Sequence, residues 1–204
     1  AARVCALVLL VALAFSFRLG VAFGITALSY VLLQIIYSLW MKRIVILDVF
    51  AIAAGFVLRA VAGGEAVAVP LSPWFFICTL LLALFLGLSK RRHELLALNE
   101  SAAEHRASLA MYNALLLDQM IAMVTAATIV TYALYTLSSE TIARLHTDAL
   151  KYTIPLVLYG IFRYLYLVYR QQEGGNPEMA LLTDRPLLIT ILLYGAMVLW
   201  ILYR

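Results

Sequence analysis

Residues 73–94 read PWFFICTLLLALFLGLSKRRHE, an apolar run that ends in a cluster of charged side chains. The run is close to the length of about 20 mostly apolar residues that a helix needs to cross a bilayer. The whole chain of 204 residues is similar, with 65% hydrophobic residues, 13% charged residues and a mean hydropathy of +0.98. Soluble domains are about half apolar and about a quarter charged. The sequence therefore predicts an integral membrane protein.

The apolar runs are too long and unbroken for barrel strands, in which apolar and polar residues alternate. We therefore expect an all-α fold, a polytopic transmembrane helix bundle. Seven spans are predicted, at Val4 to Phe17, Gly20 to Trp40, Ile44 to Ala62, Pro73 to Ser89, Ser108 to Leu137, Lys151 to Tyr169 and Pro186 to Tyr203. No gap between them holds a soluble domain, so residues 1–204 are predicted to form one transmembrane domain with a cytoplasmic loop at 90–107.

Basic residues lie mostly on one side of these predicted spans. The richer side holds Arg3, Lys42, Arg43, Lys90, Arg91, Arg92, Arg106, Arg170 and Arg185, and the other side holds Arg18, Arg144, Lys151 and Arg204. The excess of Lys and Arg in short loops marks the cytoplasmic side of a membrane protein. The segment KRRHE at 90–94 is therefore predicted to be cytoplasmic. Its simplest role is to anchor the topology and attract anionic lipid headgroups.

Ionisable residues inside the predicted spans indicate more than an anchor. Asp48 and Arg59 are 11 residues apart, which at about 100° per residue puts them on one helix face. Asp118 lies about three turns into the fifth span, and Arg163 about two turns inside the sixth. Charged groups at such depths are costly and mark functional sites, although a polar stripe that only packs helices is the alternative.

Together these residues predict a cavity that opens to the cytoplasm and is lined with cations and a few carboxylates. Guanidinium and ammonium groups bind phosphate oxygens, and carboxylates beside them suit Mg²⁺ that bridges a diphosphate. The predicted ligand is therefore phosphorylated and anionic. No glycine-rich phosphate loop, metal-type Cys or His spacing, or Ser-His-Asp signature is present.

Several stretches resemble one known family in order along the chain. They are YSLWMKR at 37–43, LDV at 47–49, GFVLRAVAGGEAV at 55–67, SPWFF at 72–76, LSKRRHELL at 88–96, LLLDQM at 115–120, YGIFRYLYLVYR at 159–170 and DRPLL at 184–188. They resemble the UbiA superfamily of membrane prenyltransferases, and within it the decaprenyl-phosphate phosphoribosyltransferase branch. The resemblance implies nine spans, of which the chain corresponds to the last seven.

The chain departs from the family at two places. The Asp-rich N-D-x-x-D-x-x-x-D signature, which holds Mg²⁺ and diphosphate after the second span, has no match, and the start AARV without an initiator Met suggests a truncation. We therefore expect this segment to be inactive alone, with no metal ligands of its own. The second Asp-rich motif of ordinary aromatic prenyltransferases, D-x-x-x-D, is replaced by the KRRHE cluster. This basic replacement suits a sugar phosphate and a lipid phosphate better than a prenyl diphosphate.

The resemblance implies transfer of 5-phosphoribose from 5-phosphoribosyl 1-diphosphate to a polyprenyl phosphate, with release of diphosphate and with Mg²⁺ as cofactor. The product is a precursor of arabinose donors in cell-wall biosynthesis. The expected location is the bacterial inner (plasma) membrane, with the site facing the cytoplasm, the bilayer as a partner and no nucleic acid; a homo-oligomer is compatible with the sequence.

Roles follow for individual residues under this interpretation. Lys42 and Arg59 are predicted to contact phosphate, with Asp48 as the third residue at the reaction centre. The predicted substrate-binding residues are Lys90, Arg91, Arg92, Glu94, Asp118, Arg163 and Tyr166. Asp48 and Glu94 would orient the cations or ligand hydroxyls. Tyrosines near a membrane boundary are typical of the aromatic belt, so Tyr169 is assigned no role.

Two other functions remain open. An ordinary aromatic prenyltransferase would keep the fold but predicts a second acidic cluster in place of KRRHE. A transporter or channel would use the membrane-embedded charges as an ion or substrate path. It predicts internal repeats with broken helices at corresponding positions, which the sequence lacks.

Overall fold

The computed structural model describes residues 2–69, 71–98, 109–171, 179 and 182–203. Across these residues the chain forms helices joined by short turns, without strands. The elements are α1 (Ala2–Leu19), α2 (Val21–Leu39), the 3₁₀ turn η1 (Met41–Arg43), α3 (Leu47–Ala66), α4 (Pro73–Leu98), the 3₁₀ turn η3 (Leu109–Met111), α6 (Ala114–Leu137), α7 (Ser139–Leu145), the 3₁₀ turn η4 (Ala149–Thr153), α8 (Ile154–Tyr166), the π turn η5 (Leu167–Gln171) and α10 (Arg185–Tyr203). The predicted all-α class is confirmed.

Within the residues that the structure describes, six helical segments are long and apolar enough to cross a membrane, by length and composition: Val21–Leu39, Leu47–Ala66, Pro73–Ala97, Ala114–Leu137, Ala149–Arg170 and Arg185–Tyr203. The apolar part of α1, Leu7–Leu19, is shorter. The prediction of a polytopic helix bundle is confirmed. Six of the seven predicted spans correspond to these segments, and the first predicted span corresponds to the shorter apolar part of α1.

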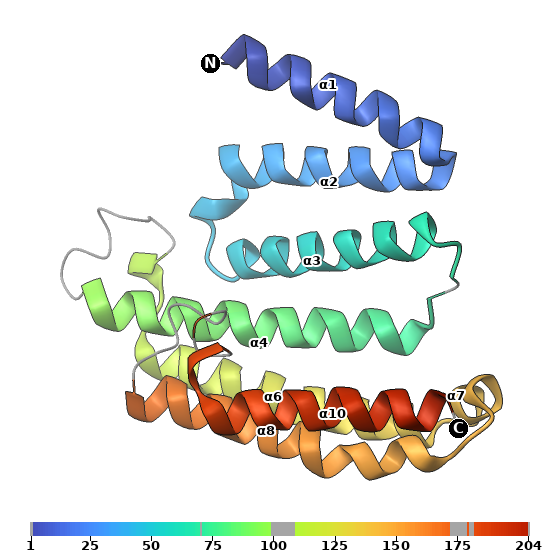
Figure 1. The fold of residues 1–204 in the computed structure, drawn as a ribbon. Coiled ribbons are helices and arrows are strands. Elements are labelled where there is room, and N and C mark those ends of the chain that lie inside the picture. Colours follow the sequence, from blue (N-terminus) through green and yellow to red (C-terminus); the bar gives the residue numbers. More distant parts are fainter. Residues whose placement is uncertain (1, 70, 99–108, 172–178, 180–181, 204) are drawn as a thin grey trace.

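Successive helices are antiparallel and lie side by side in chain order from α1 to α4, followed by α6 (Figure 1). α8 and α10 pack against each other, and α8 also contacts α6. This alternation brings the beginnings of α3, α6 and α10 and the ends of α4 and α8 to one end of the bundle. We call this the charged end, because Asp48, Arg91, Arg92, Asp118 and Asp184 lie there.

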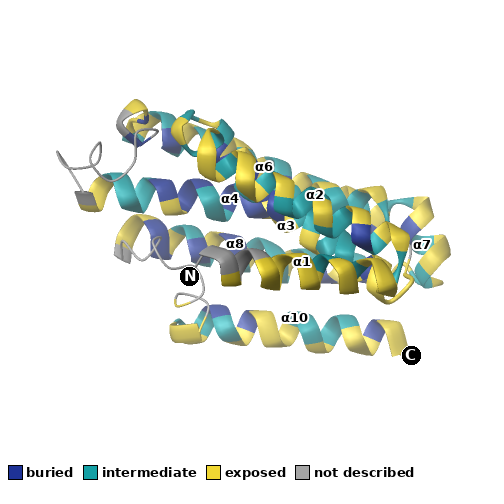
Figure 2. Cartoon of the chain, turned by 90° about the horizontal axis from the view of Figure 1, so that it is seen from above, coloured by how far each residue is buried: buried dark blue, intermediate teal, exposed yellow. Residues whose placement is uncertain are grey.

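Buried side chains lie mainly on α3, α4 and α6, whereas α1 is almost entirely exposed (Figure 2). Leu88, Leu117, Ile121 and Leu167 are among the largest fully buried residues and belong to one apolar cluster. Many large apolar side chains remain exposed on the outer faces. In a membrane these faces would lie against lipid, where exposure of an apolar side chain is not penalised.

Two predicted boundaries, and the conformation at the end of the sixth span, differ from the structure. α4 continues to Leu98, so the first residues of the segment expected to be a cytoplasmic loop, 90–98, are helical; the run KRRHELLAL contains good helix formers and no Gly or Pro. Asp118 is the fifth residue of α6, not three turns into a span, because Asn113 caps that helix by accepting a hydrogen bond from the Leu116 N–H. The sixth span ends in the π turn η5. Loop residues 99–107 lie outside the described part of the chain.

Gly87 brings α4 close to α3, and this contact yields a stability prediction. A Cβ at Gly87 would lie 2.9 Å from Cγ1 of Val49, which is only 1% exposed and cannot move aside. Gly87→Ala should therefore lower the free energy of unfolding by about 1–3 kcal/mol, the usual cost of overpacking. Thermal unfolding in detergent measures the change. Gly195→Ala is the matched control, because no atom lies within 4 Å of its Cβ; equal stability of both variants would contradict the prediction.

Candidate functional site

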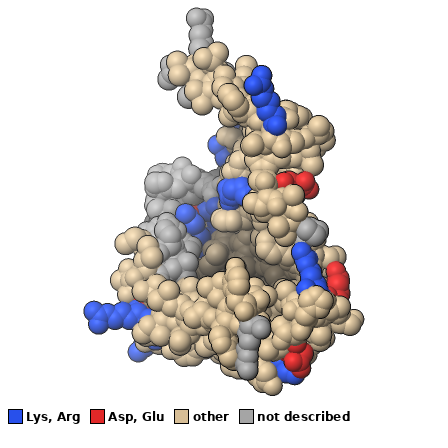
Figure 3. All heavy atoms as spheres, turned by 45° about the vertical axis from the view of Figure 1, so that its right-hand side comes forward, with Lys and Arg blue, Asp and Glu red and all other residues tan. Residues whose placement is uncertain are grey.

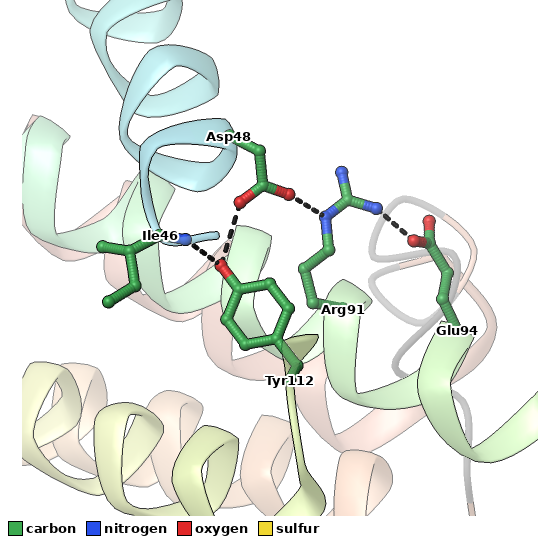
Figure 4. A network of polar contacts seen from close by, with 5 residues as sticks. All are labelled: Ile46, Asp48, Arg91, Glu94 and Tyr112. Atoms are coloured by element: carbon green, nitrogen blue, oxygen red, sulfur yellow. Dashed lines mark hydrogen bonds and ion pairs between the residues drawn. The ribbon is translucent and has the colours of Figure 1, made fainter. Parts of the chain in front are cut away.

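A buried network of polar side chains joins three elements at the charged end (Figure 4). Asp48, in the first turn of α3, is fully buried and pairs with Arg91 of α4, whose Nε lies 3.1 Å from Asp48 Oδ2. The Arg91 side chain is 4% exposed, and its Nη1 donates to Glu94 Oε2 one turn further along α4. Tyr112, next to η3, donates its hydroxyl proton to Asp48 Oδ1 at 2.9 Å.

The backbone immediately before α3 is strained. Ile46 has a φ of 70°, which is unusual for a β-branched residue, and its neighbours form a tight turn in which the Leu47 N–H donates to the Val45 carbonyl. The Ile46 N–H donates to Tyr112 Oη at 2.7 Å. The phenol therefore accepts one hydrogen bond from the strained turn and donates another to Asp48. Such strain persists only where surrounding contacts hold it in place.

The phenol of Tyr112 stays protonated in this network. Burial raises its pKa above the ordinary value, and the nearby charge of Asp48 raises it further. A neutral phenol keeps its donor to the carboxylate at every working pH. The Asp48 carboxylate also lies at the N-terminal end of α3, where the helix dipole favours a negative charge.

Arg92 belongs to a second and separate cluster. Its Nε donates to Asp118 Oδ1 at 2.6 Å, and its guanidinium carbon lies 4.2 Å from the ring centroid of Tyr169. The Tyr169 hydroxyl donates to the same Oδ1 at 3.1 Å. α4, α6 and η5 each contribute one residue. Adjacent residues on a helix point about 100° apart, so Arg91 and Arg92 reach different neighbours.

A third pair joins α8 to the start of α10. Arg163 donates to Asp184 through Nε at 3.1 Å and Nη2 at 2.7 Å, in the forked geometry typical of arginine and carboxylate. The Asp184 carboxylate also accepts a hydrogen bond from the Leu187 N–H and so caps α10. The hydrogen bond from Arg163 lowers the pKa of Asp184 below its usual range. Tyr166 lies beside Arg163, with 5.0 Å from the guanidinium carbon to the ring centroid.

The predicted site residues therefore gather at the charged end, with one departure. The structure places Asp48, Arg91, Glu94, Arg92, Asp118, Arg163 and Tyr166 in the three clusters described. Lys42, in η1, and Lys90, exposed on α4, lie at the same end and form no ion pair within the described residues.

Arg59 is the departure, because it lies far along α3 and is exposed. It donates to the Tyr30 hydroxyl at 3.0 Å, and its guanidinium carbon lies 4.2 Å from the Phe56 ring centroid. It lines a largely apolar groove of about 580 Å³ between α1, α2 and α3. Eleven residues of helix separate it from Asp48 by about 16 Å along the axis. The predicted shared face therefore does not bring these two side chains together, and its role as a phosphate contact remains a prediction.

Three residues of the clusters were missed by the sequence analysis. Tyr169 was assigned to the aromatic belt, and Tyr112 fell within the predicted span Ser108 to Leu137, where it was given no role. Asp184 had a detectable signal, because an Asp directly before Arg-Pro-Leu is typical of a helix N-cap. Its pairing with Arg163 depends on tertiary structure and could not be found from spacing.

The carboxylates at the charged end do not form a Mg²⁺ site by themselves. Asp48, Glu94, Asp118 and Asp184 are each paired with an arginine. The part of the chain that the structure describes holds no group of three or more His, Cys, Asp or Glu placed to bind a metal.

The opposite end of the bundle has a different character. A cavity of about 590 Å³ is lined by residues of α4, α6, α7, α8 and α10, including Phe75, Thr128, Tyr132 and Tyr194. Figure 3, in which this end comes forward, shows a hollowed face with mostly uncharged residues and with some basic and acidic side chains at its margin; Glu140 and Arg144 are among the residues that line the cavity. Arginine and carboxylate clusters are thus concentrated at the charged end.

The fold and these clusters define a multi-pass helical membrane protein with a cationic site at one end. No family model matches the chain. It is 31% identical to the decaprenyl-phosphate phosphoribosyltransferase of Mycolicibacterium smegmatis over 88% of its length, and 32% identical to that of Corynebacterium glutamicum over 85%. The corresponding protein of Mycobacterium tuberculosis is 25% identical over 83% of the chain.

These relatives confirm the resemblance to the phosphoribosyltransferase branch that the motifs predicted. The matched regions cover 58% of the M. smegmatis protein, 52% of the C. glutamicum protein and 55% of the M. tuberculosis protein. The chain thus spans about half the length of the curated relatives it matches.

The buried Asp48–Arg91 pair yields a second prediction. Arg91→Met leaves the buried carboxylate without its cation, which should lower the free energy of unfolding by about 3–5 kcal/mol. The double variant Asp48→Asn, Arg91→Met removes both charges and should lose less than Arg91→Met alone. Thermal or denaturant unfolding in detergent measures both. Lys90→Met, at an exposed position beside Arg91, should change stability by no more than about 0.5 kcal/mol; additive losses in the double variant would contradict the coupling.

Proposed function

We propose that the protein transfers 5-phosphoribose from 5-phosphoribosyl 1-diphosphate to a polyprenyl phosphate, a decaprenyl phosphate in the named relatives, and releases diphosphate. The observation that carries the proposal is the surplus of cations at the charged end. Asp48, Glu94, Asp118 and Asp184 pair with three arginines, and five further cations at the same end have no acidic partner among the described residues: Lys42, Arg43, Lys90, Arg170 and Arg185. Substrates that together carry several phosphates would supply the missing negative charge.

The reaction needs positioning and charge stabilisation more than a strong base. The attacking lipid phosphate is already ionised at neutral pH, and the ribose C1 becomes more positive as diphosphate leaves. Cations fixed in place before the reaction stabilise the departing charge without reorganisation. In this proposal Lys42, Lys90 and Arg92 contact phosphate groups, whereas Arg91 holds Asp48 and Glu94 and shapes the site. Arg163, with Tyr166, lines the site from α8.

The proposal also covers the membrane location, the metal ion and the partners of the protein. The charged end faces the cytoplasm of a bacterial inner membrane, and the product enters synthesis of arabinose donors for the cell wall. Mg²⁺ accompanies the diphosphate, with ligands supplied by the substrate or by residues outside the described clusters. The apolar helix faces hold the isoprenoid chain. We expect no nucleic-acid partner, and a homo-oligomer is compatible with the exposed apolar faces.

Label transfer tests the proposed reaction directly. Membranes that contain the full-length protein are supplied with Mg²⁺, polyprenyl phosphate and radiolabelled 5-phosphoribosyl 1-diphosphate, and the label in the organic phase is counted. Label should appear there only when lipid phosphate and metal are both present. Absence of label from membranes that contain folded protein would reject phosphoribosyl transfer and favour prenyl transfer to an aromatic acceptor.

Substitution at Arg92 tests the assigned contact. Arg92→Ala should lower transfer about 10- to 100-fold, because hydrogen bonds to charged groups contribute about 1.5–3 kcal/mol each. Membrane insertion and the amount of folded protein should stay unchanged. Arg18→Ala, which replaces an arginine at the opposite end of the bundle, is the matched control and should retain full activity. Undiminished transfer by Arg92→Ala would mean that this part of the basic cluster only anchors the topology.

A further inference from the structure

We propose that Tyr169 is a positioning residue that fixes the guanidinium plane of Arg92 for a phosphate group of a substrate. This inference rests on the proposed function and deepens it, because it assigns a role to a tyrosine that sequence position alone would place in the aromatic belt. It rests on three observations: the backbone at Tyr169, its contacts, and the donors that Arg92 keeps available.

The backbone places Tyr169 in an irregular turn. α8 ends at Tyr166, and Leu167–Gln171 form a π turn, in which the wider hydrogen-bond pattern rotates the following side chains relative to an α-helix. Leu167 and Val168 are buried at 0% and 2% exposure and anchor this turn in the core. π turns are rare and occur frequently at functional sites. The turn therefore gives the Tyr169 ring a fixed position at the charged end.

The contacts of Tyr169 form a closed triangle with Arg92 and Asp118. The Arg92 guanidinium lies over the ring at 4.2 Å, and both Arg92 Nε and the Tyr169 hydroxyl donate to Asp118 Oδ1. A belt tyrosine directs its hydroxyl to water or headgroups, whereas this hydroxyl is bonded to a carboxylate within the protein. Asp118 fixes one edge of the guanidinium, and the ring fixes its plane.

The other edge of Arg92 keeps its donors. A guanidinium has five N–H donors. Within the described residues Nε donates to Asp118, and Arg92 also forms a hydrogen bond with the Tyr169 side chain, so at least three donors on the terminal nitrogens remain for a ligand. Two terminal nitrogens in a fixed plane match two oxygens of a phosphate group. The Arg92 side chain is 13% exposed and that of Asp118 is 36% exposed, so the cluster is reachable. Arginine loses much rotamer freedom on binding, and a ring that holds it beforehand lowers that cost.

Variants at Tyr169 test the inference in membranes where the wild-type protein transfers label. Tyr169→Leu removes the ring and the hydroxyl, and it should raise KM for one phosphate substrate about tenfold, which is within the range of a partly desolvated cation–π contact. kcat and the thermal midpoint should stay close to wild type. Tyr169→Phe keeps the ring and should have a smaller effect. Tyr152→Leu, which removes an exposed ring beside Lys151 at the opposite end, should leave both KM values unchanged.

The substrate whose KM rises identifies the phosphate that Arg92 receives. A selective rise for 5-phosphoribosyl 1-diphosphate assigns Arg92 to the sugar, and a selective rise for polyprenyl phosphate assigns it to the lipid. The effect must also depend on Arg92: in an Arg92→Ala background, Tyr169→Leu should add less than a twofold change. An unchanged KM, a full effect in that background, or a loss confined to the thermal midpoint would overturn the inference.

The test separates this inference from the proposed function. If the wild-type protein transfers no label, the same variants are compared for binding of radiolabelled inorganic diphosphate to the purified protein. Weaker binding by both Arg92→Ala and Tyr169→Leu, with Tyr169→Phe close to wild type, would support positioning while the proposed reaction fails. Equal binding by all variants would overturn the positioning role as well.

Discussion

The buried ion pair between Asp48 and Arg91 is the contact on which the charged end depends. It joins the start of α3 to the end of α4, and Tyr112 connects it to the segment that precedes α6. A charge at such a buried position is tolerated only when a partner and hydrogen bonds compensate for the loss of water. Because the same tyrosine also holds the strained turn at Ile46, the ion pair and the backbone before α3 stabilise each other.

Two adjacent arginines consequently have different tasks. Arg91 is buried, and its guanidinium pairs with both Asp48 and Glu94. Arg92 contacts Asp118 and Tyr169, and part of its guanidinium stays accessible. The two arginines of the segment KRRHE are adjacent and identical in sequence. They contact different partners because successive side chains on a helix point in different directions. Loss of activity on replacing both arginines together would therefore mix a defect of folding with a defect of binding.

The sequence was sufficient for the helical class, the approximate spans and the gathering of most charged residues at one end, because hydropathy and helix period are local properties. The sequence was not sufficient to predict which side chains contact each other. Arg163 was expected about two turns inside the sixth span with no partner assigned, and the structure pairs it with Asp184, just before the following helix. Arg59 was expected beside Asp48 from helix rotation, but rise along the axis separates the two. Tyr112 and Tyr169 acquire their contacts only when three elements meet, and no spacing along the chain encodes this.

Paired arginines also explain how a cationic site can exist at the edge of an apolar bundle. Each carboxylate lowers the cost of placing a guanidinium near hydrocarbon and fixes its position, but the pair has no net charge. The positive charge of the end then comes from residues without such partners, which among those described are Lys42, Arg43, Lys90, Arg170 and Arg185. Fixed donors and net positive charge are thus supplied by different residues: arginines held by acids provide fixed donors, and cations without an acidic partner provide the attraction for an anion. In the proposed reaction a phosphate group would contact both types of cation.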